Sequence, residues 1–467
     1  MRKKNALTVL ENIVVEEYAA EGKSLARVNG KVIFMENAIP GDLVDIRLIR
    51  NRKDWAEGLI TRYHQYSADR VEPFCAHFGV CGGCQWQMLP YEKQLRYKQK
   101  QVEDNLSRIG KIALPAVQPL IGANKTRGYR NKMEYSFSNK RYLLASELAD
   151  PLVSSVRDSA GFHAKGIFDK IVDIGTCHLQ EEPTNLLRHA IKDWAINQHA
   201  SFYDLKLQEG WLRTLQLRIC TTGEVMVNVI FGYEDEKIKM LLDFLLLQFP
   251  KITTLLYTIN SKRNDSLTDL NPQVFFGKGY VIEKLDNFNF KIGPKSFFQT
   301  NSLQALRLYQ VIREFCGLTG GQTVYDLYCG TGSIGIFVSA LAKKIIGMEI
   351  VPEAIEDARE NAAINKITHA SFFAGDVTDL CTEDFYVQHG KPEIIITDPP
   401  RAGMHERLIR KILDIGAGIL VYASCNPATQ ARDLNRLDEK YRVTRIQPVD
   451  LFPHTHHIEN VIRLELR

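Results

Sequence analysis

Three cysteines, Cys75, Cys81 and Cys84, lie close together in the segment CAHFGVCGGC. Thiolate sulfur binds zinc and iron–sulfur clusters, so this segment predicts a metal site. Zinc sites commonly use two C-x2–4-C pairs, and the sequence holds no second pair. The spacing C-x5-C-x2-C is closer to the plant ferredoxin pattern, which adds one distant cysteine. We therefore expect an iron–sulfur site with a fourth ligand elsewhere in the chain.

A second group of residues has the spacing of a cofactor site. Gly330, Gly332 and Gly335 form GxGxxG directly after the strand-like run TVYDLYC. Glu349 follows Gly330 at the separation along the sequence that is expected for an acid that binds ribose hydroxyls. The pattern fits a dinucleotide or S-adenosylmethionine. Asp398 in TDPPRAG and the antiparallel strand pair expected at the end of the chain favour S-adenosylmethionine.

Cys425 is the candidate nucleophile. It follows the strand-like run GILVYAS and precedes a proline turn, at the sheet edge where the glycine turn and Asp398 are expected. A reactive thiol needs a lowered pKa, and the helix expected to begin near Ala428 could lower it through its positive end. A cysteine inside a strand is otherwise a small buried apolar residue, and we interpret three others in this way: Cys220, Cys316 and Cys381.

Glu459 is the candidate general base. It lies in PHTHHIENV, directly before the last expected strand, and could face the same cleft as Cys425. The three histidines of this segment lack a fourth metal ligand nearby, so we expect them to position other residues.

The elements around these residues predict a multidomain protein. Residues 1–65 alternate short β-type runs with turns and predict a small β-barrel of OB-like type. Residues 66–290 hold the cysteine segment, a helix ending near Gly110, and a central α+β domain. Residues 291–467 alternate strands and helices, which predicts a doubly wound, Rossmann-like α/β domain with its site at the carboxyl ends of the strands.

Composition excludes several protein classes. The chain has 467 residues, 45% hydrophobic and 24% charged, which is typical of globular proteins. Acidic residues follow the basic start before any long apolar stretch, so we expect no signal peptide. The most apolar run, 241–249, is too short to span a membrane. We expect a cytoplasmic protein in which cysteines serve metal binding, catalysis or packing.

Positive charge is concentrated in residues 90–141, where twelve lysines and arginines stand against four acids. Five aromatic residues interleave with them: Tyr91, Tyr97, Tyr129, Tyr135 and Phe137. Cations can neutralise phosphates and aromatic rings can stack on bases, so the block is compatible with a nucleic-acid surface. A solvated helix and strand face also explains these charges, and for the block taken alone it is the slightly favoured interpretation.

The combined motifs resemble one family. SCNPAT, DPPR, YDLYCGTGSIG, FFQTN and HHIENV together resemble the RNA uridine-C5 methyltransferases, and in particular the 23S rRNA 5-methyluridine type with a TRAM domain and an iron–sulfur cluster. The resemblance implies a TRAM-like RNA-binding barrel at residues 1–65 and a class I methyltransferase domain at 291–467. It also implies an RNA substrate, with rRNA preferred to tRNA. Nothing in the sequence specifies the oligomeric state, and we expect a monomer.

The resemblance assigns roles to particular residues. It implies that Cys425 adds to C6 of uracil, which makes C5 nucleophilic, and that Glu459 then removes the C5 proton. Gln299, Tyr328, Glu349 and Asp398 would contact S-adenosylmethionine, with Asp376 near the adenine. Elimination among the remaining cysteines leaves Cys177 as the fourth cluster ligand, and the resemblance implies the same residue. A [4Fe–4S] cluster is thus expected on Cys75, Cys81, Cys84 and Cys177.

Three other functions fit these residues less well. A base-amine methyltransferase needs no nucleophilic cysteine and usually has an aromatic residue where Arg401 stands. An RNA cytosine-C5 methyltransferase has a further cysteine where Pro400 stands. A non-catalytic RNA-binding module would leave Cys425 and Glu459 without a role.

Overall fold

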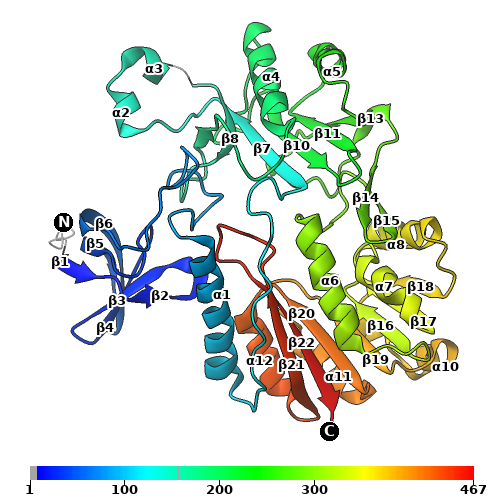
Figure 1. The fold of residues 1–467 in the computed structure, drawn as a ribbon. Helices are drawn as coiled ribbons and strands as arrows, with labels where there is room; N and C mark the ends of the chain where they lie inside the picture. The colour runs from blue at the N-terminus through cyan, green and yellow to red at the C-terminus, as the bar shows by residue number, and fades with distance from the viewer. Residues whose placement is uncertain (1–7, 156) are drawn as a thin grey trace.

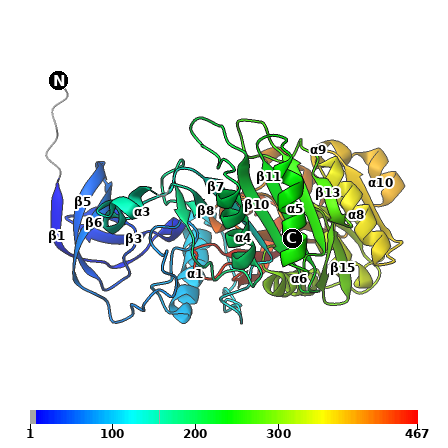
Figure 2. The same ribbon diagram turned by 90° about the horizontal axis from the view of Figure 1, so that it is seen from above.

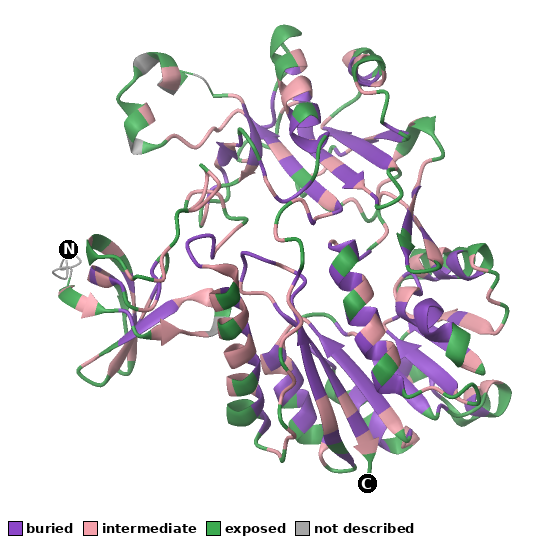
Figure 3. Cartoon of the chain, in the orientation of Figure 1, coloured by how far each residue is buried: buried purple, intermediate pink, exposed green. Residues whose placement is uncertain are grey.

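The computed structural model describes residues 8–155 and 157–467. Figure 1 shows three sheet-containing parts in chain order: N-terminal strands, a central sheet with helices, and a C-terminal sheet with helices on both faces. Seen from above, the N-terminal strands lie at one end of the molecule, next to helix α1 (Figure 2). Buried residues follow the strands of each part (Figure 3). Among the described residues, no helix is long and apolar enough to cross a bilayer.

The N-terminal part is one six-stranded sheet in the order β1-β5-β6-β4-β3-β2. Its strands are β1 (Val9–Val14), β2 (Glu17–Tyr18), β3 (Ser24–Val28), β4 (Lys31–Met35), β5 (Leu43–Asn51) and β6 (Trp55–Gln65). The predicted strands are thus present, but β1 and β2 are the two edges of the sheet and do not pair with each other. A closed barrel is therefore not confirmed. Residues 1–7 of the predicted barrel lie outside the described residues.

The segment between the first two sheets is irregular up to α1 (Tyr91–Asn105), which continues as a π-helical turn (Leu106–Gly110). The helix prediction and its end at Gly110 are confirmed, with Lys111 in the left-handed region at φ 52°. The π-helical turn packs against helix α12 (Pro427–Leu437) of the C-terminal part. Helix α1 therefore stands between the N-terminal and C-terminal sheets (Figure 1).

The central sheet has seven strands in the order β13-β12-β11-β10-β7-β8-β9. They are β7 (Lys132–Ser138), β8 (Ser159–His163), β9 (Ile171–Asp173), β10 (Leu212–Ile219), β11 (Val225–Phe231), β12 (Thr254–Ile259) and β13 (Gln273–Gly277). Helices α4 (Thr184–Asn197) and α5 (Lys237–Gln248) bury apolar residues against it, as their amphipathic patterns predict. Two short helices, α2 (Ala145–Leu148) and α3 (Pro151–Ser155), project away from this sheet (Figure 1).

A hairpin of β14 (Val281–Leu285) and β15 (Phe288–Ile292) leads to the C-terminal sheet. That sheet has the order β18-β17-β16-β19-β20-β22-β21, with five parallel strands and an antiparallel pair at one edge. Its strands are β16 (Thr323–Leu327), β17 (Lys344–Glu349), β18 (Ala370–Ala374), β19 (Ile394–Thr397), β20 (Ile419–Ser424), β21 (Tyr441–Val449) and β22 (Glu459–Leu466). The predicted doubly wound sheet and terminal strand pair are both confirmed.

Helices cover both faces of this sheet and enclose two apolar cores. They are α6 (Ser302–Cys316), α7 (Ser333–Val338), α8 (Pro352–Ile364), α9 (Val377–Leu380), α10 (Glu383–His389), α11 (Glu406–Ile415) and α12. Three cysteines are buried, as predicted: Cys220, Cys316 and Cys381. The strand order reverses beside β16, so ligands are expected at the carboxyl ends of β16 and its neighbours.

Candidate active site and cysteine pocket

The glycine turn after β16 has the backbone shape that requires glycine. Gly330 and Gly332 have φ angles of 53° and 75°, in the left-handed region. A Cβ at Gly332 would lie 2.9 Å from the Phe372 ring, whereas a Cβ at Gly330 would meet no atom within 4 Å. The turn is therefore closely packed on one side and open at Gly330, where a ligand could approach the backbone.

Two acidic residues hold this turn. Glu349, at the end of β17, accepts a hydrogen bond from the backbone N–H of Gly330 at 3.2 Å. Asp326, in β16, accepts one from the N–H of Gly335 at 2.8 Å through Oδ2, but its buried Oδ1 has no partner. Burial raises the pKa of Asp326 to about 7. Asp326 was not among the predicted site residues, although an acid inside an apolar strand just before a glycine turn is a signal that could have singled it out.

The predicted cofactor residues lie around the same edge. Tyr328 directly follows β16 with a φ of 60°, and burial raises the pKa of its hydroxyl, with the charge of Asp376 adding to the rise. Asp376 accepts a hydrogen bond from the Thr378 N–H at 2.7 Å as the N-cap of α9. Gln299 is buried before α6, and its carbonyl accepts a bond from Asn131 Nδ2 at 2.9 Å. The structure therefore gathers all the predicted cofactor residues at one end of the sheet.

Three loops bring Asp398, Cys425 and Glu459 to neighbouring positions at this edge. Asp398 follows β19, Cys425 follows β20, and Glu459 begins β22. The pairing of Ser424 with Asn460 between β20 and β22 places Cys425 and Glu459 at the next step of the same ladder. Glu459 is buried, whereas Cys425 and Asp398 keep some exposure to solvent.

Burial and neighbouring negative charges disfavour the ionised forms of Asp398, Cys425 and Glu459. Burial and the neighbouring Asp398 raise the pKa of Glu459 well above its usual range, and burial raises that of Asp398 to about 7. Burial also raises the pKa of the Cys425 thiol to about 11, reinforced by Glu459 and Asp398 and opposed by Arg401. The predicted lowering of the thiol pKa is therefore wrong for the protein by itself, because burial, reinforced by two carboxylates, raises this pKa.

Arg401 connects the three loops. Its backbone carbonyl accepts hydrogen bonds from Asn426 Nδ2 at 3.0 Å and Thr429 Oγ1 at 3.2 Å, both on the loop and helix that follow Cys425. Its guanidinium Nη2 lies 2.9 Å from His457 Nδ1, two residues before Glu459. Arg401 therefore fixes the DPPR loop against both of the other loops, and His457 positions a neighbour, as the sequence predicted for these histidines.

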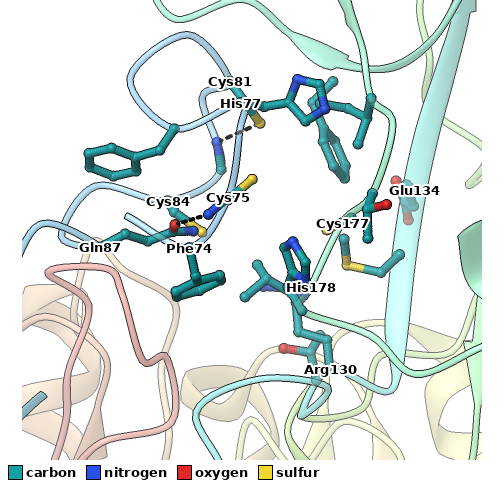
Figure 4. Close-up of a pocket in the computed structure, with 18 of the residues that line it drawn as sticks. Phe74, Cys75, His77, Cys81, Cys84, Gln87, Arg130, Glu134, Cys177 and His178 are labelled. Atoms are coloured by element: carbon teal, nitrogen blue, oxygen red, sulfur yellow. Dashed lines mark hydrogen bonds between the residues drawn. The ribbon is translucent and has the colours of Figure 1, made fainter. Parts of the chain in front are cut away.

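The four predicted cluster cysteines line one pocket. Figure 4 shows Cys75, Cys81 and Cys84 on the irregular segment before α1, with Cys177 entering from the opposite side of the pocket. The pocket has a volume of about 370 Å³ and also contains Phe74, His77, Gln87, Arg130 and His178. The Cys177 backbone is held by Asn185, whose Oδ1 accepts from the Cys177 N–H at 2.8 Å. Cysteines separated by 92 intervening residues thus line one pocket, as predicted.

The thiols of the four pocket cysteines line a cavity and do not converge on a single position. Within residues 8–155 and 157–467, no three His, Cys, Asp or Glu side chains are placed closely enough to hold a single metal ion. Burial raises the pKa of Cys81 to about 11 and that of Cys84 to about 12. The backbone N–H of Gly83 donates to Cys81 Sγ at 3.4 Å, the kind of bond that stabilises a thiolate ligand. The described residues therefore form no metal-ion site, and the iron–sulfur cluster stays a prediction from the cysteine pattern.

The comparisons with known proteins identify the family. A family model described as tRNA (Uracil-5-)-methyltransferase matches residues 270–467. A Bacteroides thetaiotaomicron protein described as an uncharacterized RNA methyltransferase is 53% identical over 453 residues, covering 96% of this chain and 100% of the relative. The chain belongs to the RNA uracil-C5 methyltransferase family. A similarly described relative from Porphyromonas gingivalis is 47% identical and covers 96% of the chain.

A solved structure extends this family assignment over the whole chain. The crystal structure of Pyrococcus abyssi tRNA (uracil-54, C5)-methyltransferase in complex with S-adenosyl-L-homocysteine superposes with a TM-score of 0.75 at 28% identity. It covers 97% of this chain and 100% of the Pyrococcus chain. The protein is therefore an RNA methyltransferase with a multidomain α/β structure, and its C-terminal part has the methyltransferase fold that the sequence predicted.

The structure corrects the interpretation of the basic block in this family member. Tyr129, Tyr135 and Phe137 are buried in or beside the central core and cannot stack on RNA bases. Lys98 is fully buried, with its Nζ 2.7 Å from Asp450 Oδ1. Their sequence spacing gave no sign of this, because the residues that bury them come from distant parts of the chain.

Proposed function

We propose that this protein forms 5-methyluridine in 23S rRNA through a covalent Cys425 adduct. The observation that carries the proposal is the placement of Cys425 and Glu459 at one step of the β20–β22 ladder, beside Asp398 and the open glycine turn. A methyltransferase that acts on an exocyclic amine needs no such pair. C5 of uracil does, because it is a poor nucleophile until a thiolate adds to C6.

The proposed cofactor is S-adenosylmethionine. The Pyrococcus relative was crystallised with the demethylated product of this cofactor. The chain's own residues fit it: the turn is open at Gly330, Glu349 faces the turn, and Asp326 has a buried oxygen without a partner. The cofactor supplies a methyl group on a positively charged sulfur. Tyr328, Gly332, Asp376, Gln299 and Asp398 complete the proposed contacts.

The two catalytic residues act in sequence. Cys425, which is partly exposed, gives its proton to solvent, and the thiolate Sγ then bonds to C6 of the uracil. The electron pair of the C5–C6 double bond makes C5 nucleophilic. Once C5 carries the methyl group, the Glu459 carboxylate takes the C5 proton, the double bond re-forms, and Cys425 Sγ leaves. The raised pKa values of Cys425 and Glu459 mean that both must be deprotonated before they can act, and a cation bound beside Asp398 would favour that.

We further propose that Cys75, Cys81, Cys84 and Cys177 hold a [4Fe–4S] cluster. The cluster would join the segment before α1 to the central sheet. Protein purified without air should contain about four irons per chain and absorb near 400 nm, as thiolate-bound clusters do. Cys177→Ser should lower the iron content, whereas Cys220→Ser, which alters a buried cysteine outside the pocket, should not. Iron-free protein with an intact fold would refute the cluster.

The RNA substrate has two candidates. Ribosomal RNA follows from the resemblance to the cysteine-bearing 23S rRNA enzymes. Transfer RNA is favoured by the Pyrococcus relative, which covers the full length and acts on uracil-54 of tRNA. Mass spectrometry of rRNA and tRNA from cells with and without the gene separates them. We expect one 5-methyluridine to disappear from 23S rRNA. Loss from tRNA alone would make tRNA the substrate. If no 5-methyluridine disappears, the function is wrong or a second enzyme modifies the same site.

The N-terminal sheet and residues 66–290 are proposed to bind the RNA around its target base. The target uridine must leave its stack to reach Cys425. Sequence-specific RNA recognition commonly uses such unpaired bases in loops. The proposed boundaries of the three parts remain 1–65, 66–290 and 291–467.

A further inference from the structure

The cysteine-bearing segment is in direct contact with the loop that carries Glu459. We call residues 450–458 the histidine loop. The backbone N–H groups of Gln85 and Trp86 both donate to the His454 carbonyl, at 2.8 and 3.0 Å. Gln94, on α1, accepts a bond from the His454 N–H at 2.9 Å. About 360 residues of chain separate these partners, so the contact is a feature of the folded molecule alone.

The Gln85 side chain makes the contact that points toward the reaction centre. Its Oε1 lies 2.6 Å from His456 Nδ1 and accepts a longer bond from the His456 N–H at 3.4 Å. Gln85 directly follows Cys84, one of the four cysteines of the pocket. The residue after the last cysteine of the segment is thus bonded to a residue three positions before Glu459.

A series of contacts continues from His456 to both sides of the centre. The His456 and His457 rings are in contact, with centroids 4.2 Å apart and ring planes tilted by 46°. His457 Nδ1 lies 2.9 Å from the Arg401 guanidinium, and the Arg401 carbonyl accepts from the loop that follows Cys425. Displacing His456 would therefore disturb the orientation of Glu459 and of Arg401 together.

The His456 side chain is closely packed and has little room to adopt another conformation. A Cβ at Gly22, in the turn before β3, would lie only 2.8 Å from His456 Cβ. Gly22 is itself tied to the cysteine segment, since its carbonyl accepts from Trp86 Nε1 at 3.3 Å. Three parts of the chain therefore meet at His456: the N-terminal sheet, the cysteine segment and the histidine loop.

We propose that Gln85 is a positioning residue for the methylation reaction: it transmits the geometry of the cysteine pocket to the base Glu459 through His456. The inference rests on the proposed function and deepens it. It gives the cysteine segment a role in the reaction that requires no electron transfer. A glutamine suits this position because one neutral amide oxygen accepts two hydrogen bonds from the same histidine.

The test compares Gln85→Ala with Gln85→Glu, which keeps an acceptor oxygen. For Gln85→Ala we expect kcat to fall about tenfold, the loss expected for one positioned hydrogen bond. The KM values for RNA and S-adenosylmethionine should change less than about twofold. The fraction of enzyme covalently bound to RNA at steady state, read on a denaturing gel, should rise because the proton-removal step is slowed. Gln85→Glu should recover most of kcat.

The controls distinguish a loss of positioning by Gln85 from a loss of folding and from a loss of iron in the cysteine pocket. Gln388→Ala, at an exposed glutamine of α10 outside these contacts, should behave like the parent protein. Iron content and thermal stability of Gln85→Ala should equal those of the parent. If Gln85→Ala does not fold, His456→Ala is measured instead, with the same expected result.

Parental kcat in Gln85→Ala would overturn the inference. So would a fall in kcat accompanied by loss of iron, of RNA affinity or of thermal stability, because Gln85 would then only support the fold. Both results leave the proposed function standing if the parent enzyme methylates uridine. A parent enzyme that methylates no uridine would instead refute the proposed function itself.

Discussion

Replacing Asp398 with asparagine should stabilise the protein at neutral pH while weakening S-adenosylmethionine binding. Burial raises the pKa of Asp398 from 3.8 to about 7 in the folded protein. Below about pH 4 both the folded and the unfolded chain hold this proton, and between about pH 4 and 7 only the folded chain does. The unfolded state therefore binds fewer protons, so stability falls as the pH rises through this window and stays low above it.

The magnitude follows from the two pKa values. A difference of about 3 between them corresponds to roughly 4 kcal/mol of folding free energy above pH 7. This figure is an upper limit, because Asp398 keeps some solvent exposure and interacts with Glu459. Asparagine is neutral at every pH, so the variant should exceed the parent by about 1–4 kcal/mol at pH 8 and by clearly less at pH 4.5.

The assay is urea denaturation of both proteins at pH 4.5, 6 and 8, with S-adenosylmethionine affinity measured by calorimetry at pH 8. Asp376→Asn is the matched control. Hydrogen bonds from Thr378 lower the pKa of Asp376, so its substitution should cost stability at neutral pH rather than add it. A stability difference for Asp398→Asn that is constant from pH 4.5 to 8, or negative at pH 8, would refute the reasoning.

Two further predictions follow from buried and titrating groups. Lys98→Met leaves Asp450 buried without its cation and should destabilise the fold by about 3–5 kcal/mol in urea denaturation. The Lys98→Met, Asp450→Leu double variant should recover part of this loss. A Lys98→Met protein whose free energy of unfolding lies within about 1 kcal/mol of the parent would contradict this. In the protein without cofactor, alkylation of Cys425, followed by mass spectrometry of its peptide, should rise about tenfold per pH unit up to about pH 11 and should be slower in Arg401→Gln. A plateau below pH 9 would contradict the burial of this thiol among carboxylates.

Local patterns were sufficient to predict the C-terminal sheet and the residues at its edge. The glycine turn at Gly330 and Gly332, the acid at Glu349 and the cysteine after a strand are short-range signals, each set by the backbone within a few residues. Parallel strands then bring their carboxyl ends together without further information. The meeting of Cys177 with the cysteine segment was predicted by elimination among the remaining cysteines and by the family resemblance, since no local pattern specifies a partner beyond 92 intervening residues.

Features that depend on long-range packing could not be predicted. The buried pair of Lys98 and Asp450 joins residues 352 positions apart, and in sequence Lys98 is one more cation in a basic block. The thiol pKa of Cys425 depends first on its burial and then on carboxylates from two other segments of the chain. The edges of the N-terminal sheet are likewise decided by which strands pair, and the alternating pattern of each strand is the same in an open or a closed sheet.

The central claim is that Cys425 forms a bond to the target uridine and that Glu459 is needed to release it. The most direct test incubates Glu459→Gln protein with S-adenosylmethionine and the RNA identified by mass spectrometry, then separates the products on a denaturing gel. Glutamine is close in size to glutamate but cannot take the C5 proton. We predict a stable protein–RNA adduct whose digestion yields a Cys425 peptide bonded to a methylated uridine, and no adduct when Cys425→Ala is added. Normal turnover by Glu459→Gln, or an adduct at another cysteine, would contradict the account.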